Sequence, residues 1–401
     1  MESFIKSAKY SYDLKSLVVF RNLLDDAVVK KFIALLEAIE NTSDTVLQLE
    51  KYADFVSELY KYNVNFTSYM LKKIFEDENV YVKSKCSNYD EGNGLLLDEC
   101  VLHELETLNT VSRIQSEEIK THIDYSKYLP NWKTSSLNFV DEYLFRIKNI
   151  SSYGYGIFAE YKMFIVQNGE IVPIKHPDTT TLEELTGYKR ERQIVIDNTK
   201  ALIDGKPASN VLLYGDAGTG KSSTVKAVCN KFAENGLRII QIEKKNIHDI
   251  PKIMDSLNRN PLKFIIFIDD LSFNSDDNDF STLKAILEGN VSSRANNVVI
   301  YATSNRRHLV KESFSDREGD DIHFNDTVQE LTSLSERFGI SVKFMQPSKK
   351  DYLEIVHSLA KANDIDMPTE ELDMLAERFV LGRNGRSPRS AKQFILGLKC
   401  K

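Results

Sequence analysis

The stretch Gly215-Asp216-Ala217-Gly218-Thr219-Gly220-Lys221-Ser222 satisfies the pattern G-x-x-x-x-G-K-[ST] at every position. Its glycines let the backbone wind tightly, so that successive N–H groups point at the oxygens of a phosphate. The ammonium of Lys221 suits the β- and γ-phosphates, and the hydroxyl of Ser222 suits Mg²⁺. The pattern predicts a phosphate loop that extends to Ser223. An accidental glycine-rich turn is the alternative.

Short apolar segments on both sides of this loop predict the strands of one sheet. Helical spacing of apolar residues separates them, and the segments are 211–214, 239–242, 264–268, 298–303 and 340–344. Five strands that alternate with helices predict a parallel sheet covered on both faces. After Pro347 the strands end and three helices follow. The first of them begins with the capping-box pair Ser348 and Asp351.

Two acids, Asp269 and Asp270, directly follow the apolar segment 264–268. Ligands of open α/β sheets bind outside the carboxyl ends of the strands. We therefore expect Asp269 to hold Mg²⁺, directly or through water, and Asp270 to polarise an attacking water. The alternative is that two acids simply end a strand at solvent. Asn305 follows the next predicted strand and could reach the same water, or it could be a loop-capping asparagine.

Two arginines also need an explanation. Arg337 comes immediately before the last predicted strand, and Arg389 lies in the first turn of a helix that follows Ser387-Pro388. A cation in the first turn opposes the helix dipole. Arg389 also lies about 200° around the helix from Ala391, which belongs to its apolar face. This position favours an anion near Arg389, and a solvated arginine is the alternative.

The first 135 residues or so contain no glycine before Gly92 and show helical spacing. One apolar stripe consists of Leu24, Val28, Val29, Phe32, Leu35, Leu36 and Ile39, and a second consists of Val46, Leu49, Ala53, Val56 and Tyr60. Such stripes are typical of helix faces buried in a core. The β-prone segments 162–167 and 170–174 flank Asn168-Gly169, which predicts a hairpin.

Composition agrees with a globular chain of several domains. The chain has 401 residues, 42% of them apolar and 28% charged, with a net charge of −7. This charge gives no overall electrostatic signal for nucleic acid. The apolar runs are too short for a membrane helix, and we expect a cytoplasmic protein without membrane contact. The four cysteines (Cys86, Cys100, Cys229 and Cys400) lack metal-site spacing and are expected to be reduced.

Taken together, the motifs resemble those of an AAA+ P-loop ATPase. The region from Arg337 onward resembles the replication-initiator and helicase-loader branch. Over nearly the whole chain the sequence is similar to the bacterial ATPase family called domain of unknown function 815. The similar segments include Leu185-Thr-Gly187-Tyr188, Phe267-Ile-Asp269-Asp270-Leu271-Ser272-Phe273, Tyr301-Ala-Thr-Ser-Asn305-Arg306-Arg307-His308-Leu309 and Gly385-Arg386-Ser387-Pro388-Arg389.

The resemblance implies an α/β fold with a five-stranded parallel sheet and a C-terminal helical lid, preceded by a mostly α-helical domain. The expected boundaries are a helical N-terminal domain over 1–155, a β-hairpin and linker over 156–181, an ATPase core over 182–346 and the lid over 347–401. ATP and Mg²⁺ are the implied cofactors. The resemblance also implies a homo-oligomer and a macromolecular client, for which nucleic acid is one possible class.

The resemblance also implies a role for each matching residue. The phosphates would be bound by Gly215, Asp216, Ala217, Gly218, Thr219, Gly220, Lys221, Ser222 and Ser223, with Mg²⁺ on Ser222 and Asp269. Leu185, Gly187 and Tyr188 would lie against the adenine. Asn305 and Arg389 would be the two sensors of the γ-phosphate. Arg337 would be an arginine finger that reaches the site of a neighbouring subunit.

One departure from the AAA+ pattern affects the expected activity. Most AAA+ proteins have glutamate where this chain has Asp270, which is one methylene shorter. Three hypotheses follow: an ATPase that remodels or loads a client, an ATP-gated scaffold that hydrolyses slowly, and a small-molecule kinase. The kinase is disfavoured because no acceptor pocket is recognisable. Arg306-Arg307-His308 could contact a partner subunit, a nucleic acid or nearby acidic loops.

Overall fold

The computed structural model describes residues 9–86, 94–272, 278–288, 296–305, 336–382 and 385–399. By its internal contacts the chain divides into two units, Met1–Glu160 and Tyr161–Lys401. None of the helices in these described ranges is both long enough and apolar enough to cross a membrane.

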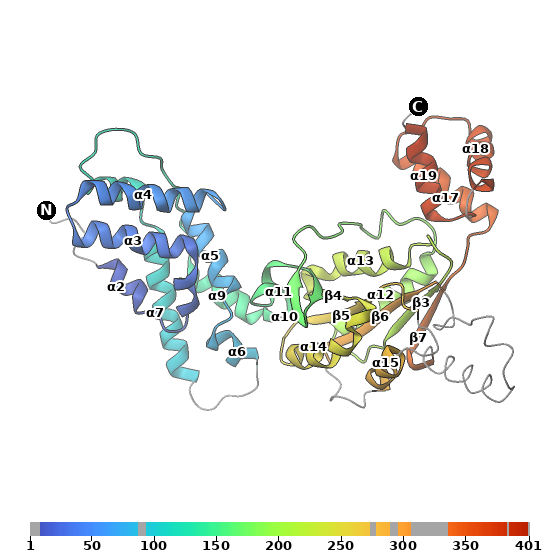
Figure 1. Cartoon of the computed structure of the whole chain (residues 1–401), viewed down its shortest axis with the longest axis horizontal. Coiled ribbons are helices and arrows are strands. Elements are labelled where there is room, and N and C mark those ends of the chain that lie inside the picture. Colours follow the sequence, from blue (N-terminus) through green and yellow to red (C-terminus); the bar gives the residue numbers. More distant parts are fainter. Residues whose placement is uncertain are drawn as a thin grey trace. The chain divides into compact units, whose positions relative to one another are not determined.

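The first unit is helical in its described part (Figure 1). Its elements are α2 (Tyr10–Lys15), the 3₁₀ turn η1 (Arg21–Asp25), α3 (Ala27–Asn41), α4 (Thr45–Tyr60), α5 (Phe66–Glu76), α6 (Val80–Cys86), α7 (Gly94–Ser112), α8 (Ser116–Lys120), α9 (Phe139–Lys148), α10 (Ile150–Tyr153) and α11 (Ile157–Glu160). One hydrophobic core joins the elements from α2 to α9, and the apolar stripe predicted on α3 belongs to it. Asp26 caps α3 by accepting hydrogen bonds from the backbone N–H groups of Val28 and Val29.

The stripe predicted on α4 is only partly confirmed. Val56 is buried and Leu49 packs against the core, but Val46, Ala53 and Tyr60 are exposed. The buried residues of this helix are Gln48, Tyr52, Phe55, Val56, Glu58 and Leu59. Large aromatic rings set the orientation, because Phe55 packs against Phe32 at 4.7 Å between ring centroids. Gln48 is tolerated on the buried face because its amide donates to the carbonyl oxygens of Ala38 and Thr42.

The described part of the second unit holds a seven-stranded sheet with the order β2-β1-β4-β5-β6-β3-β7. The strands are β1 (Met163–Gln167), β2 (Glu170–Pro173), β3 (Val211–Gly215), β4 (Leu237–Ile242), β5 (Lys263–Ile268), β6 (Val298–Ser304) and β7 (Ile340–Phe344). Every strand pair is parallel except β1 with β2. The five predicted strands are therefore confirmed in position and direction.

The predicted number of strands is wrong, because the hairpin joins the same sheet. The hairpin itself is confirmed: β1 and β2 pair antiparallel around Asn168 and Gly169, which both have positive φ. β1 also pairs in parallel with β4, where Phe164 faces Ile240. Phe164 is fully buried, so the apolar residues of the hairpin extend the core of the sheet.

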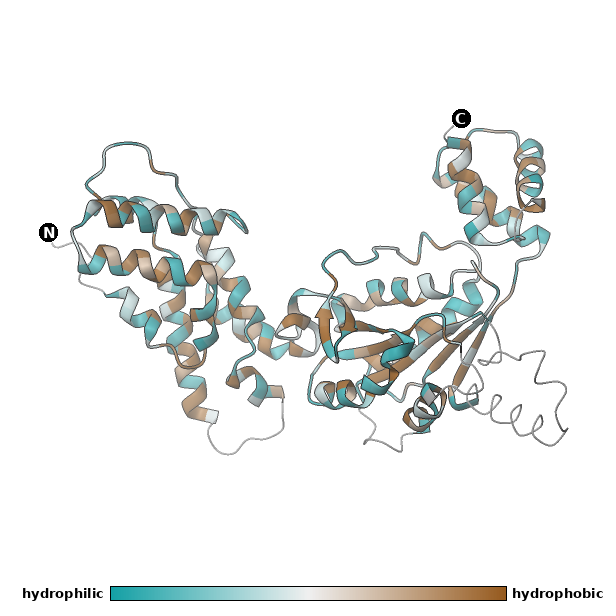
Figure 2. Cartoon of the chain, viewed as in Figure 1, coloured by the Kyte–Doolittle hydropathy of each residue, from teal (hydrophilic) through white to brown (hydrophobic). Residues whose placement is uncertain are grey.

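Helices cover both faces of this sheet (Figure 1). They are α12 (Lys189–Ile203), α13 (Lys221–Phe232), α14 (Ile250–Leu257) and α15 (Asn278–Glu288), with the short 3₁₀ turns η2 (Ala233–Asn235) and η3 (Lys244–Asp249). Figure 1 shows α13 along one face and α14 and α15 along the other. Figure 2 shows that the strands between them are mainly hydrophobic, as expected for a sheet buried on both sides.

The lid, residues 347–401, contains α17 (Lys349–Ala362), α18 (Thr369–Leu381) and α19 (Pro388–Lys399), which share a hydrophobic core of their own. The predicted cap is confirmed, because Ser348 Oγ accepts a hydrogen bond from Asp351 N at 3.2 Å. The α/β fold class, with a phosphate loop in the sheet and a helical lid after it, is confirmed as well.

Gly215, the last residue of β3, is required by the packing of the sheet. Its φ is +134°, and a Cβ there would lie 2.0 Å from the backbone oxygen of Phe344 in β7. That oxygen accepts a hydrogen bond from Asp216 N, so the two strands hold the beginning of the phosphate loop between them. No other residue type fits this position without separating β3 from β7.

We expect Gly215→Ala to lower the free energy of unfolding by about 3 kcal/mol or more, because a strained φ and a backbone clash add together. Gly205→Ala is the matched control: its φ is +70°, and a Cβ there would meet nothing within 4 Å. The control should cost only about 1 kcal/mol. Chemical denaturation followed by circular dichroism measures both, and equal losses would contradict the clash.

Candidate functional site

A cavity of about 530 Å³ opens at the carboxyl end of the sheet, beside the phosphate loop. The loop contributes residues 217–223, and its glycines Gly218 and Gly220 have φ of +78° and +92°. Gly220 directly precedes α13, which begins at Lys221. The first N–H groups of that helix have no partner within the helix, and its dipole favours an anion at this end. The volume is within the range of small-molecule sites in proteins.

Lys221 is buried, with 6% of its surface exposed. Its ammonium donates to the backbone oxygens of Gly215 at 2.9 Å and Asp216 at 2.8 Å, and to Asn305 Oδ1 at 3.1 Å. Burial lowers the pKa of Lys221 from its usual value, and the carboxylates of Asp216, Asp270 and Asp269 oppose that shift. All three donors of a compact, buried charge therefore point at oxygen atoms, which phosphate oxygens could replace.

One carboxylate oxygen joins three segments of the chain. Asp269 Oδ1 accepts hydrogen bonds from Ser222 Oγ and from Thr303 Oγ1, both at 2.6 Å. The Thr303 hydroxyl accepts in turn from Asp270 N at 2.9 Å. Thr303 lies on β6 with 2% of its surface exposed. Sequence reasoning missed this residue, although a hydroxyl near the carboxyl end of an apolar strand was a usable signal.

Asp270 and Asn305 contact each other directly. The Asn305 amide donates from Nδ2 to Asp270 Oδ1 at 2.7 Å and accepts the Lys221 ammonium on its own Oδ1. Because an ammonium only donates and a carboxylate only accepts, one orientation of the amide satisfies both partners. Asp270 has a left-handed φ of +53°, which is uncommon for a residue other than glycine. Asn305 thus links the acid after β5 to the lysine of the loop.

The lid reaches the same cavity through α17 and α19. Arg389 and Lys392 of α19 line it, as does Leu359 of α17. Arg389 N donates to the oxygen of Gly218 at 3.3 Å. A Cβ at Gly218 would lie 3.2 Å from the Cβ of Arg389, so the loop and the first turn of α19 are in close contact. The lid therefore adds two cationic side chains to the wall of the cavity.

The predicted adenine contacts are distributed differently. Leu185 lines the cavity. A Cβ at Gly187 would instead lie 3.0 Å from Ile355 of α17. Tyr188 stacks on Phe344 at 5.2 Å between ring centroids and donates from its hydroxyl to Met345 O at 2.5 Å.

The Asp216 side chain also contacts the segment that leads into the lid. Its Oδ2 accepts a hydrogen bond from Gln346 N at 2.6 Å. Tyr188 and Asp216 therefore both bind the residues between β7 and α17, through a side-chain hydroxyl in one case and a carboxylate in the other.

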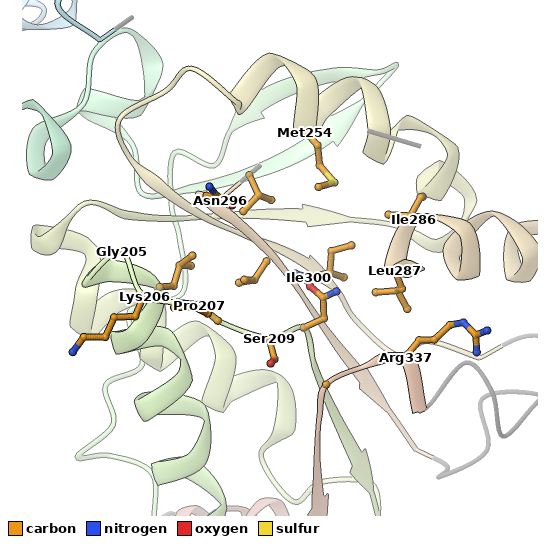
Figure 3. A pocket seen from close by; sticks show the side chains of 16 residues that line it. Gly205, Lys206, Pro207, Ser209, Met254, Ile286, Leu287, Asn296, Ile300 and Arg337 are labelled. Carbon is orange, nitrogen blue, oxygen red and sulfur yellow. Dashed lines mark hydrogen bonds between the residues drawn. The ribbon is translucent and has the colours of Figure 1, made fainter. Parts of the chain in front are cut away.

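Arg337 lies away from the loop, at the amino end of β7. It lines a second cavity of about 430 Å³ (Figure 3). It also forms an ion pair with Glu288. This cavity also contains Asn210, just before β3, and Val298, the first residue of β6. Parallel strands place their amino ends at the edge opposite the phosphate loop. The structure thus does not bring Arg337 to the cavity beside the phosphate loop of its own chain. Arg306, Arg307 and His308 lie outside the described residues.

Two side chains near the loop could serve as ligands of Mg²⁺. Ser222 and Asp269 offer a hydroxyl and a carboxylate, which are hard oxygen ligands of the kind that this ion prefers. Within the described ranges, no group of three or more His, Cys, Asp or Glu side chains could hold a metal ion. A magnesium ion here would therefore need phosphate oxygens and water to complete its octahedral shell.

Residues 159–401, more than half of the chain, match the family described as Protein of unknown function (DUF815), and the chain belongs to that family. Among solved structures it is similar to the Thermotoga maritima RuvB Holliday junction branch migration motor, with 17% identity and a TM-score of 0.37 over 55% of this chain and 64% of that one. A DNA replication initiation factor is 19% identical, with a TM-score of 0.36 over 55% and 64% of the two chains.

The chain thus matches less than two thirds of the length of either solved structure. A search of curated proteins finds no match.

We expect Thr303→Val to weaken the binding of ATP in the presence of Mg²⁺ by about tenfold, because the Asp269 carboxylate and the Asp270 N–H lose a buried partner. Thr303→Ser keeps the hydroxyl and should bind within about twofold of wild type. Isothermal titration calorimetry measures both variants. Equal affinities for the valine variant and wild type, or an equal loss in the serine variant, would contradict the role of this hydroxyl.

Proposed function

We propose that this DUF815 protein is a Mg²⁺-dependent ATPase whose nucleotide state changes the lid and a neighbouring subunit, and so remodels or loads a macromolecular client. One observation carries the proposal: a loop lysine, two acids, an amide and a lid arginine from distant parts of the sequence line one cavity. They are Lys221, Asp269, Asp270, Asn305 and Arg389. This is the set that binding and cleavage of a triphosphate requires.

Binding follows from the loop. Backbone N–H groups of residues 217–222 and the Lys221 ammonium would bind the β- and γ-phosphates in place of the oxygens that Lys221 contacts now. Arg389 would add a charge from the lid side of the cavity. Ser222 and Asp269 would hold magnesium, which neutralises charge on the phosphate oxygens. Since Ser222 and Asp269 are hydrogen-bonded to each other, they are already arranged as neighbouring ligands.

Hydrolysis would depend on Asp270 and Asn305. An acid at the carboxyl end of β5 can accept a proton from water as the water attacks the γ-phosphate, and Asn305 can orient that water. Their mutual hydrogen bond of 2.7 Å keeps both groups at one point beside the loop. We place this activity in the cytoplasm.

Arg337 fits a function in an assembly. It lies at the edge of the sheet opposite its own loop, where it is paired with Glu288, so it could reach a nucleotide site only in another copy of the chain. We propose that the chain forms a homo-oligomer in which Arg337 contacts the γ-phosphate bound by the neighbour. Nucleic acid is among the possible classes of the client.

A second candidate function has one specific observation in its favour. Asp270 is shorter than glutamate and is hydrogen-bonded to Asn305 from a left-handed backbone conformation. A carboxylate held in this way would activate water poorly. The protein would then act as an ATP-gated scaffold that binds the nucleotide tightly and hydrolyses it slowly.

For the ATPase proposal, we expect Lys221→Ala to reduce the rate of phosphate release from ATP by about a hundredfold or more, since a buried charge is lost from the transition state. Lys231→Ala, an exposed lysine of the same helix, should leave the rate unchanged. Phosphate release in the presence of Mg²⁺ measures both. If wild type and Lys221→Ala release phosphate equally, the ATPase proposal fails. Slow release combined with ATP-dependent assembly on gel filtration would favour the scaffold.

The shared site predicts that Arg337→Ala and Lys221→Ala proteins complement each other. Each is expected to be inactive alone, and a mixture should recover part of the activity because some interfaces combine an intact loop with an intact arginine. Glu288→Ala is the control, because it breaks the ion pair of Arg337 and keeps the guanidinium. Full activity in Glu288→Ala with no recovery in the mixture, at concentrations where both proteins assemble, would contradict a finger supplied by the neighbour.

A further inference from the structure

Arg192 of α12 lines the cavity beside the phosphate loop and is buried, with 8% of its surface exposed. Its backbone N–H donates to Tyr188 O within the helix. Its guanidinium carries five N–H donors, and among the residues that the structure describes it has no hydrogen-bond or ion-pair partner. Another buried arginine of the same unit, Arg238, donates to the oxygens of Ala233 and Leu237 at 2.8 and 2.9 Å. Arg192 differs from Arg238 in having its donors unused.

Arg192 is buried as a residue, but its guanidinium nitrogens are not among the fully buried polar atoms, so its donors keep some exposure to solvent. Burial lowers the pKa of Arg192, with only the adjacent Glu191 opposing the shift, yet an arginine stays protonated in proteins. The charge therefore remains in a partly desolvated place at the cavity wall, without a hydrogen-bonded side chain among the described residues. Groups kept in this condition at a cavity wall are candidates for ligand contacts, because a bound molecule supplies the missing acceptors.

The position of Arg192 indicates which part of a ligand it meets. The wall that it shares with Thr180, Glu184 and Leu185 comes from the segment before β3, not from the phosphate loop. Asn230 of α13 donates to Thr180 O at 2.9 Å, and Asn230 lies about 13 Å farther along α13 than Lys221 at 1.5 Å per residue. This wall therefore extends from the loop toward the far end of α13.

The phosphate end of the cavity already has its own cations and donors. Lys221, Arg389 and Lys392 line it together with the N–H groups of the loop. The same cavity also offers apolar surface from Leu185 and from Leu359 of the lid, which suits the faces of an aromatic ring. A guanidinium next to such surface can donate to the ring nitrogens or carbonyl oxygens of a base, or stack on the ring.

We propose that Arg192 determines nucleotide specificity by binding the base of the nucleoside triphosphate, with its guanidinium donating to acceptors on the ring. The proposal rests on the proposed nucleotide-binding function of the same cavity. It assigns recognition of the base to a charged side chain of α12 in addition to Leu185, which lines the same cavity.

The test compares ATP with inorganic tripolyphosphate, which has the phosphates and lacks the nucleoside. We expect Arg192→Met, which keeps the length and removes the charge, to bind ATP about tenfold or more weakly than wild type. Its affinity for tripolyphosphate should change by less than about twofold. Arg190→Met is the matched control on the same turn of α12, where the arginine is exposed, and it should bind both ligands like wild type.

A second measurement separates recognition from a structural role. Without nucleotide, the thermal midpoint of Arg192→Met should equal or exceed that of wild type, because the guanidinium that is removed has no hydrogen-bond or ion-pair partner among the described residues. An unchanged affinity for ATP, an equal loss for ATP and tripolyphosphate, or a lowered midpoint would each overturn the proposal. A wild-type protein that binds neither ligand would instead refute the proposed function on which it rests.

Discussion

The site depends on one buried ammonium group. Lys221 has 6% of its surface exposed, and its three donors reach oxygens of the loop and of Asn305. Burial of a charge is tolerated only when hydrogen bonds compensate for lost hydration, so the loop, β5 and β6 have to meet at this point. Ser222, the next residue of the same helix, donates to the Asp269 carboxylate, which follows β5 and also accepts from Thr303 on β6. The fold thus satisfies two opposite charges side by side.

Much of the fold could be predicted because buried parallel strands leave a simple signal. Five apolar segments gave β4, β5, β6, β3 and the edge strand β7, because most residues of the four inner strands among them are apolar and buried. The hairpin was predictable from Asn168-Gly169, whereas its partner was not, because a turn fixes the pairing within a hairpin and leaves its outer edge undetermined. On α4, Tyr52 and Phe55 belong to the buried face, and the predicted stripe was offset from that face because it left these two rings out.

The loop, the acids and Asn305 were predictable by position because all follow the carboxyl ends of strands in one sheet. Thr303 was missed because threonine is an ordinary strand residue, and its role appears only when the neighbouring strand places Asp269 at 2.6 Å from its hydroxyl. Arg192 was equally invisible, since a sequence shows which residue is charged and does not show whether that charge has a partner.

The contacts of Tyr188 and Asp216 have a mechanical consequence. Both hold the short segment after β7, through Met345 O and Gln346 N, at the place where the chain leaves the sheet for α17. The segment that connects the sheet to the lid is therefore bound by Asp216 of the phosphate loop and by Tyr188. A small shift of the loop backbone at Asp216 would also move this connecting segment, and a small rotation there would displace the far ends of the three lid helices by a larger distance.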